Sequence, residues 1–322
     1  MGDEVWRDDY PEGVVVPKLS FEEQADRVNE LFLEHNPAEH LLIRLRLLAA
    51  THDRLDELGS VVSGEFHIEG VDLGMTDAPT KEEAWRFVTV ESVVLLHTAA
   101  ESLLRLFFAM LDDRWTPWVG IAEARNFREF TKRVEAWQSL ADEEAATDVS
   151  YAVYRRRLGP DHEAIGTIVD IVRDAARIWI DEGDLYNAVK HGFAAVAGGS
   201  RVEFRPADDS IAPVVFGDGR VLETLTVRKG VGRHDRNWIS LPRNMVQVLL
   251  ICQTITEMWR TARAYYRVDE EWPTPEAPTA TYREAMGSLF TEGRGRMSGP
   301  LIFVPTESKG DSEGGPPSES GT

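Results

Sequence analysis

Apolar residues recur at intervals of three and four along most of this chain, which is the spacing of one face of an α-helix. One such stripe consists of Phe127, Phe130, Val134, Trp137 and Leu140. The same periodicity predicts helices over residues 21–35, 37–58, 81–112, 127–143, 148–158, 162–182, 184–191 and 243–267. The pattern therefore predicts a mainly α protein built as a helical bundle.

Several of these helices are preceded by the signature of a capping box. In such a box, a small polar side chain accepts a hydrogen bond from an amide of the first turn, and a glutamate three residues later reaches back. The signature occurs at Ser20 with Glu23, Asn36 with Glu39, Thr80 with Glu83, and Asn126 with Glu129. These pairs predict where the helices begin.

Two stretches change from helical to alternating spacing. Residues 60–74 combine apolar residues with glycines and predict a short hairpin. Residues 193–241 contain alternating runs at 202–205 and 221–227, separated by glycine-containing turns. The second stretch predicts a small antiparallel β-sheet inserted at about 193–241 between two helices of the bundle.

The two ends of the chain differ from its centre. Residues 1–19 are expected to form an N-terminal extension, and 20–270 the bundle with its β-insert. Residues 271–322 are rich in proline, glycine and glutamate and predict a linker and a disordered C-terminal tail. Within that tail, the apolar run 301–305 is expected either to dock as a strand on this chain or a partner chain, or to be a chance feature of the linker.

Composition narrows the range of partners. A net charge of −20 argues against a protein that coats nucleic acid non-specifically or binds an anionic membrane surface. It does not exclude a local basic pocket. The longest apolar stretch, from Phe87 to Leu111, is interrupted by Glu91, His97, Glu101 and Arg105, which favours a long core helix and no membrane span. The N-terminus has no secretory signal, so the expected compartment is the cytoplasm. Cys252 is the only cysteine, which excludes an intrachain disulfide.

The most distinctive candidate chemistry lies at the end of the helix predicted for 184–191. Tyr186, Asn187, Lys190 and His191 fall within one and a half turns, directly before Gly192. An imidazole, an amide and a lysine at a helix end would suit phosphodiester cleavage. Alternatively, Lys190 and His191 simply cap the negative end of the helix dipole.

This motif resembles that of the HEPN domains, helical bundles in which a helix carries Arg, a polar residue that is often Asn, three further residues and His. Asn187 and His191 match the pattern, and Tyr186 stands in the place of the arginine. The resemblance covers about 81–195 and 243–267. It implies RNA or a nucleotide as ligand, metal-independent ribonuclease activity in a toxin or antiviral defence setting, and a homodimer. Other members of the family only bind.

Two further groups are candidates for supporting roles. His97, Glu101 and Arg105 recur every four residues on an apolar helix, where they are expected either to contact and orient His191 or Lys190, or to form an intrahelical ladder. Arg155, Arg156 and Arg157 form either a phosphate-binding cluster or a solvated surface.

No zinc, di-iron or nucleotide-binding motif occurs in the chain, so neither a metal nor a cofactor is expected. Two functions therefore stay open. One is a protein that binds or cleaves RNA or a nucleotide without metal, with Tyr186, Asn187, Lys190 and His191 at the site. The other is a non-catalytic interaction module that engages a protein partner through its sheet and tail.

Overall fold

The structure is a computed structural model, and it describes the bundle, most of the inserted sheet and one strand of the C-terminal segment. The residues that it describes are 20–57, 67–69, 71–72, 79–112, 116–123, 126–155, 163–190, 195–199, 202–204, 214–216, 220–228, 231–266 and 296–300. The expected N-terminal extension, 1–19, and most of the expected disordered tail lie outside them. The predicted fold, a mainly helical bundle with a small antiparallel β-insert, is confirmed.

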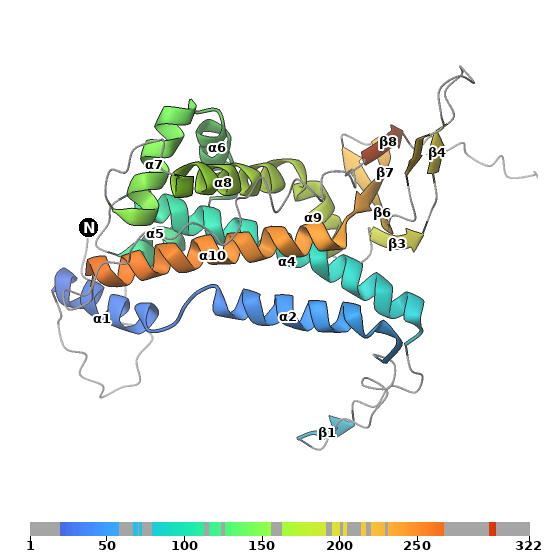
Figure 1. The fold of residues 1–322 in the computed structure, drawn as a ribbon, viewed down its shortest axis with the longest axis horizontal. Helices are drawn as coiled ribbons and strands as arrows, with labels where there is room; N and C mark the ends of the chain where they lie inside the picture. Colours follow the sequence, from blue (N-terminus) through green and yellow to red (C-terminus); the bar gives the residue numbers. More distant parts are fainter. Residues whose placement is uncertain are drawn as a thin grey trace, which may run out of the picture.

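Two long helices form the centre of the bundle. They are α4 (Lys81–Leu111) and α10 (Leu241–Tyr266), which pack side by side (Figure 1). Around them lie α1 (Phe21–Leu33), α2 (Glu39–Asp53), α5 (Pro117–Glu123), α6 (Phe127–Gln138), α7 (Asp142–Tyr154), α8 (Glu163–Asp181) and α9 (Gly183–Lys190). Because α4 contacts α2, α5, α7, α8, α9 and α10, it is buried on nearly every side. Leu103, Leu104, Phe107 and Met110 on α4 are fully buried.

Helix α4 is also long and apolar enough, by length and composition alone, to cross a membrane. Within its most apolar window, 72% is buried inside the protein. This burial is what the core of a helical bundle requires.

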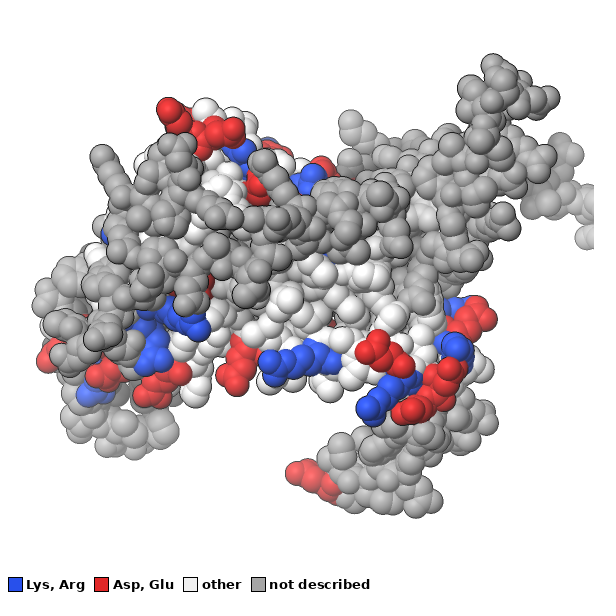
Figure 2. Space-filling model, in the orientation of Figure 1, with Lys and Arg blue, Asp and Glu red and all other residues white. Residues whose placement is uncertain are grey.

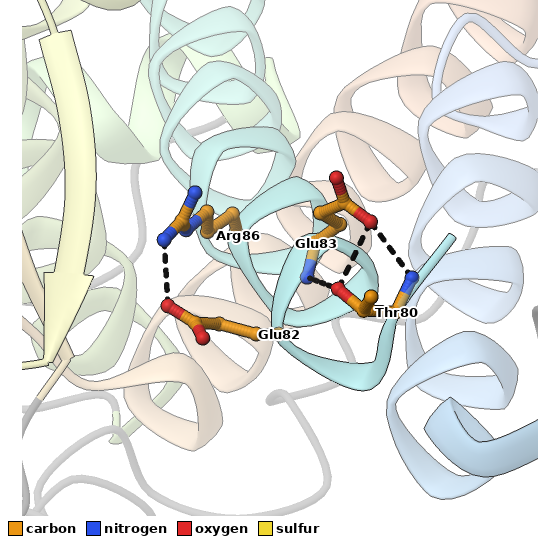
Figure 3. A network of polar contacts seen from close by, with 4 residues as sticks. All are labelled: Thr80, Glu82, Glu83 and Arg86. Atoms are coloured by element: carbon orange, nitrogen blue, oxygen red, sulfur yellow. Dashed lines mark hydrogen bonds and ion pairs between the residues drawn. The ribbon is translucent and has the colours of Figure 1, made fainter.

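The capping boxes predicted at Ser20 and Thr80 are confirmed. At the start of α4, the Glu83 amide donates to the Thr80 hydroxyl (3.2 Å), and the Thr80 amide donates to the Glu83 carboxylate (2.8 Å) (Figure 3). The Thr80 hydroxyl also donates to the Glu83 carboxylate (2.9 Å). The two bonds that this carboxylate accepts from Thr80, the backbone one first, lower the pKa of Glu83. One turn further, Arg86 pairs with Glu82 at 2.6 Å.

Other helix boundaries differ from the prediction. The box expected at Asn36 is wrong, because α2 begins at Glu39 and Asn36 instead accepts a hydrogen bond from the Ala38 amide (2.9 Å). Helix α7 begins at Asp142 rather than at 148, since its acidic first turn suits the positive end of the helix dipole. The prediction missed α5 altogether.

The inserted β-structure follows α9 and precedes α10, as predicted. Its strands are β3 (Ala195–Gly199), β4 (Val202–Phe204), β5 (Val214–Phe216), β6 (Arg220–Arg228) and β7 (Val231–Ile239). Strands β6 and β7 form a hairpin, β3 pairs with β6, and β4 pairs with β5 in a separate sheet, all antiparallel. The hairpin expected within 60–74 is the pair β1 (His67–Ile68) and β2 (Val71–Asp72).

One segment of the expected disordered tail has regular structure. Residues Arg296–Pro300 form β8, which pairs with β7 and completes a four-stranded sheet in the order β3-β6-β7-β8. The strand immediately precedes the apolar run 301–305, which lies outside the described residues. Expecting disorder for 296–300 was therefore wrong, because the edge of β7 supplies these residues with backbone partners.

Charged side chains of both signs are interspersed over the face shown in Figure 2, with an uncharged strip between them. The exposed apolar residues Ile43, Leu47 and Leu249 belong to α2 and α10. The described part of this face presents no broad basic surface.

Candidate functional site

Helix α9 carries Tyr186, Asn187 and Lys190 of the predicted motif, and an apolar face of its own holds it in place. Leu185 and Val189, one turn apart, pack with Val93 of α4 and Leu222 of β6. The helix therefore lies in the angle between the central helix and the inserted sheet. Its opposite face is free to carry polar side chains.

Tyr186 anchors α9 to the bundle through an aromatic stack. Its ring lies parallel to that of His97 on α4, with 3.9 Å between centroids and 1° between planes. The His97 ring also contacts Trp179 of α8, at 5.1 Å between centroids. Where the HEPN pattern has an arginine, this chain thus has a half-buried ring turned toward the core.

His97 is a neutral stacking group. Its side chain is only 4% exposed, and neither ring nitrogen has a hydrogen-bond partner among the described residues. Burial, and secondarily the charge of Lys190, lowers the pKa of His97 from 6.5 to about 4. At neutral pH this imidazole is therefore uncharged and does not serve as a general acid.

Asn187 and Lys190 lie on the exposed face of α9. The Lys190 ammonium is 5.6 Å from the centroid of the Tyr186 ring, within the range of a cation–π contact. Within the described chain, neither side chain makes a hydrogen bond, so both have donors available for a ligand. His191 follows Lys190 directly but lies outside the described residues.

The predicted supporting residues on α4 separate into two groups. Glu101 accepts a hydrogen bond from Arg105 Nε at 2.8 Å, and the Arg105 guanidinium lies 4.8 Å from the centroid of the Phe130 ring. This is the intrahelical pair that was one of the two predicted alternatives. His97 does not join it and instead supports Tyr186.

Arg155 lies far from α9. It ends α7 in the left-handed conformation (φ 52°), and its guanidinium packs over the rings of Tyr151 and Tyr265 at 5.0 and 4.8 Å. It also contacts Met110 of α4 at 3.8 Å, and Met110 is roughly 20 Å along that helix from His97. Arg155 therefore does not contribute to a site on α9. Arg156 and Arg157 lie outside the described residues.

A buried polar cluster, which the sequence did not predict, joins α10 to α4 and α8. Asp174 of α8 is 5% exposed, accepts a hydrogen bond from Gln247 of α10 and pairs with Arg177. Asn244 of α10 donates to the Ser92 hydroxyl of α4 at 3.2 Å. The available signal was the pair Asn244 and Gln247, polar residues three apart at the start of an apolar helix.

No group of three or more His, Cys, Asp or Glu residues that could hold a metal ion occurs in the described ranges. Nor does any protein-family model, curated protein or solved structure match the chain. The resemblance to HEPN domains therefore stays a prediction carried by the motif on α9.

Proposed function

We propose that this chain binds RNA or a nucleotide at the exposed face of α9, without a metal ion. The observation that carries the proposal is the division of α9 into two faces. Tyr186 and the apolar residues hold the helix against the bundle, while the side chains of Asn187 and Lys190 face solvent and make no hydrogen bond to any described residue. The Lys190 ammonium suits a phosphate, and the Asn187 amide suits a base edge or a ribose hydroxyl.

His191 extends the proposal from binding to cleavage. In sequence it follows Lys190 directly and comes four residues after Asn187, which is the HEPN spacing. An imidazole there would serve as the general acid or base for attack of a ribose hydroxyl on the adjacent phosphate. The resemblance places such an activity in a toxin or antiviral setting.

The charge of the chain limits the mode of binding. A net charge of −20 repels an extended polyanion, so we expect a short ligand segment contacting one or two phosphates. The logarithm of the affinity for single-stranded RNA should then fall with the logarithm of the salt concentration with a slope of about −1.

The test is binding of a labelled single-stranded RNA, and separately of ATP, to the full chain. Lys190→Ala should weaken binding about tenfold or more, the loss expected for a charge-assisted phosphate contact. The matched control is Lys132→Ala, which removes another exposed lysine, from α6, and should change the affinity by less than about twofold. Equal losses in the two variants would show that any binding is non-specific and would remove α9 from the proposal.

A second candidate, a non-catalytic interaction module, rests on a different observation. The C-terminal strand β8 adds to the edge of β7, so the inserted sheet accepts strands from outside its own hairpin. If neither RNA nor ATP binds while a protein partner does, this candidate replaces the first.

A further inference from the structure

Tyr186 lies at the border between the packed side and the solvent-facing side of α9. Successive residues of a helix are rotated by about 100°, which sets the order of the side chains around its axis. Leu185 and Val189 form the buried side, and Asn187 and Lys190 form the exposed side. Tyr186 falls between the two pairs, which explains why its side chain is half-buried.

One side of the Tyr186 ring is already covered by a buried aromatic group. The ring of His97 stacks on it at 3.9 Å between centroids, and only 4% of His97 is exposed. The exposed part of Tyr186 therefore belongs to the opposite side of its ring and to the ring edge. Because Trp179 contacts His97 at 5.1 Å, the stack is supported from within the bundle. A ring held in this way can receive a second flat group without losing the first contact.

The polar groups beside this ring suit the remaining parts of a nucleotide. The Lys190 ammonium is 5.6 Å from the centroid of the Tyr186 ring, and Asn187 is the next residue in the chain. A nucleotide joins its flat base to its phosphate through a single sugar. A base on the ring and a phosphate at the ammonium can therefore belong to the same nucleotide. The ammonium would then exchange its contact with the ring for a charge-assisted hydrogen bond.

We propose that Tyr186 is a stacking platform for an unpaired nucleobase, which extends the stack of His97 and Tyr186 by a third ring. Lys190 binds the phosphate, and the Asn187 amide binds the edge of the base. This assignment, which rests on the proposed function, narrows the ligand to nucleotides and single-stranded RNA. A base inside a duplex is paired and covered by its neighbours, so duplex RNA does not fit. Where the HEPN pattern has a guanidinium for the phosphate, this chain has a ring for the base.

The experiment compares ATP with inorganic tripolyphosphate, which has the same number of phosphates and no base. Both affinities are measured by calorimetry on the full chain without added metal ions. The wild type should bind ATP about tenfold more tightly, the gain expected for one base stacked on an aromatic side chain. Tyr186→Leu should reduce this ratio to less than about twofold, whereas Tyr186→Phe keeps the ring and should retain it.

A second comparison uses RNA of one sequence as a single strand and as a blunt duplex. The wild type should bind the single strand about tenfold more tightly, and Tyr186→Leu should remove most of that difference. The matched control is Tyr265→Leu, which removes a tyrosine that is 43% exposed near the end of α10. This control should leave both preferences as they are in the wild type.

The outcomes separate the stacking platform from the proposed phosphate site. Tripolyphosphate binding that depends on Lys190, with ATP bound no more tightly, would overturn the platform and leave the phosphate site in place. If Tyr186→Leu weakens both ligands equally, Tyr186 only anchors α9. If the preference for ATP survives in Tyr186→Leu, the base binds elsewhere, and the platform is again wrong. A wild type that binds neither ligand nor RNA would overturn both the platform and the proposed function.

Discussion

Replacing His97 by phenylalanine should change how the stability of the protein depends on pH. The ring of His97 is 4% exposed, stacks on Tyr186, and has its pKa lowered from 6.5 to about 4. Between these two values the unfolded chain binds a proton at His97 that the folded chain does not. The contribution of the neutral His97 side chain to the free energy of unfolding is therefore fully present above pH 6.5, and it is lost as the pH falls toward 4.

The size of the effect follows from the two pKa values. Each pKa unit corresponds to about 1.4 kcal/mol. Lowering the pH from above 6.5 to below 4 should therefore reduce the free energy of unfolding by about 3 kcal/mol in total. At pH 5 the loss is about 2 kcal/mol, because the unfolded imidazole is then almost fully protonated and the folded one is not. Phenylalanine keeps an aromatic ring against Tyr186 and cannot be protonated.

The assay is urea unfolding of the wild type and His97→Phe at pH 7.5, 6 and 5. The wild type should lose about 2 kcal/mol more than the variant between pH 7.5 and pH 5. His40→Phe, the same replacement at an exposed position of α2, serves as the control and should follow the wild type. If the curves of the wild type and His97→Phe are parallel, the His97 imidazole is accessible to solvent or paired, and the account of the α9 anchor is wrong.

Three further outcomes follow from the same contacts. Tyr186→Arg recreates the HEPN pattern but removes the stack on His97, so it should lower the free energy of unfolding by about 1 kcal/mol, whereas Tyr186→Phe should leave it nearly unchanged in a denaturant titration. Gln247→Leu removes a donor from the buried Asp174 carboxylate and should cost about 2 kcal/mol in the same assay; a loss under about 0.5 kcal/mol would show that Asp174 is satisfied without it. Thr80→Ala removes the cap of α4 and should cost about 1 kcal/mol, and an unchanged midpoint would contradict a stabilising role for that capping box.

Much of the helical architecture was predictable because its causes are local. The capping boxes at Ser20 and Thr80 join residues only three apart, so the pattern of side chains specifies them without any tertiary contact. The stripe from Phe127 to Trp137 and the alternation along β4 and β6 likewise follow from the periods of helix and strand. Where a start depended on a weaker local preference, as at Asn36 or at Asp142, the predicted boundary was wrong.

The tertiary structure alone decided which of these elements meet. Tyr186 and His97 are almost ninety residues apart in sequence, and Gln247 and Asp174 are 73 apart, so neither contact is visible in any local pattern. Such contacts depend on which faces pack after the chain has closed long loops, a step whose entropy no short window of sequence encodes. The residue types and spacing in the sequence identified α9 as the candidate site. Only the packing showed that Tyr186 anchors the helix while Asn187 and Lys190 stay at the surface, because that division depends on which face of α9 contacts the bundle.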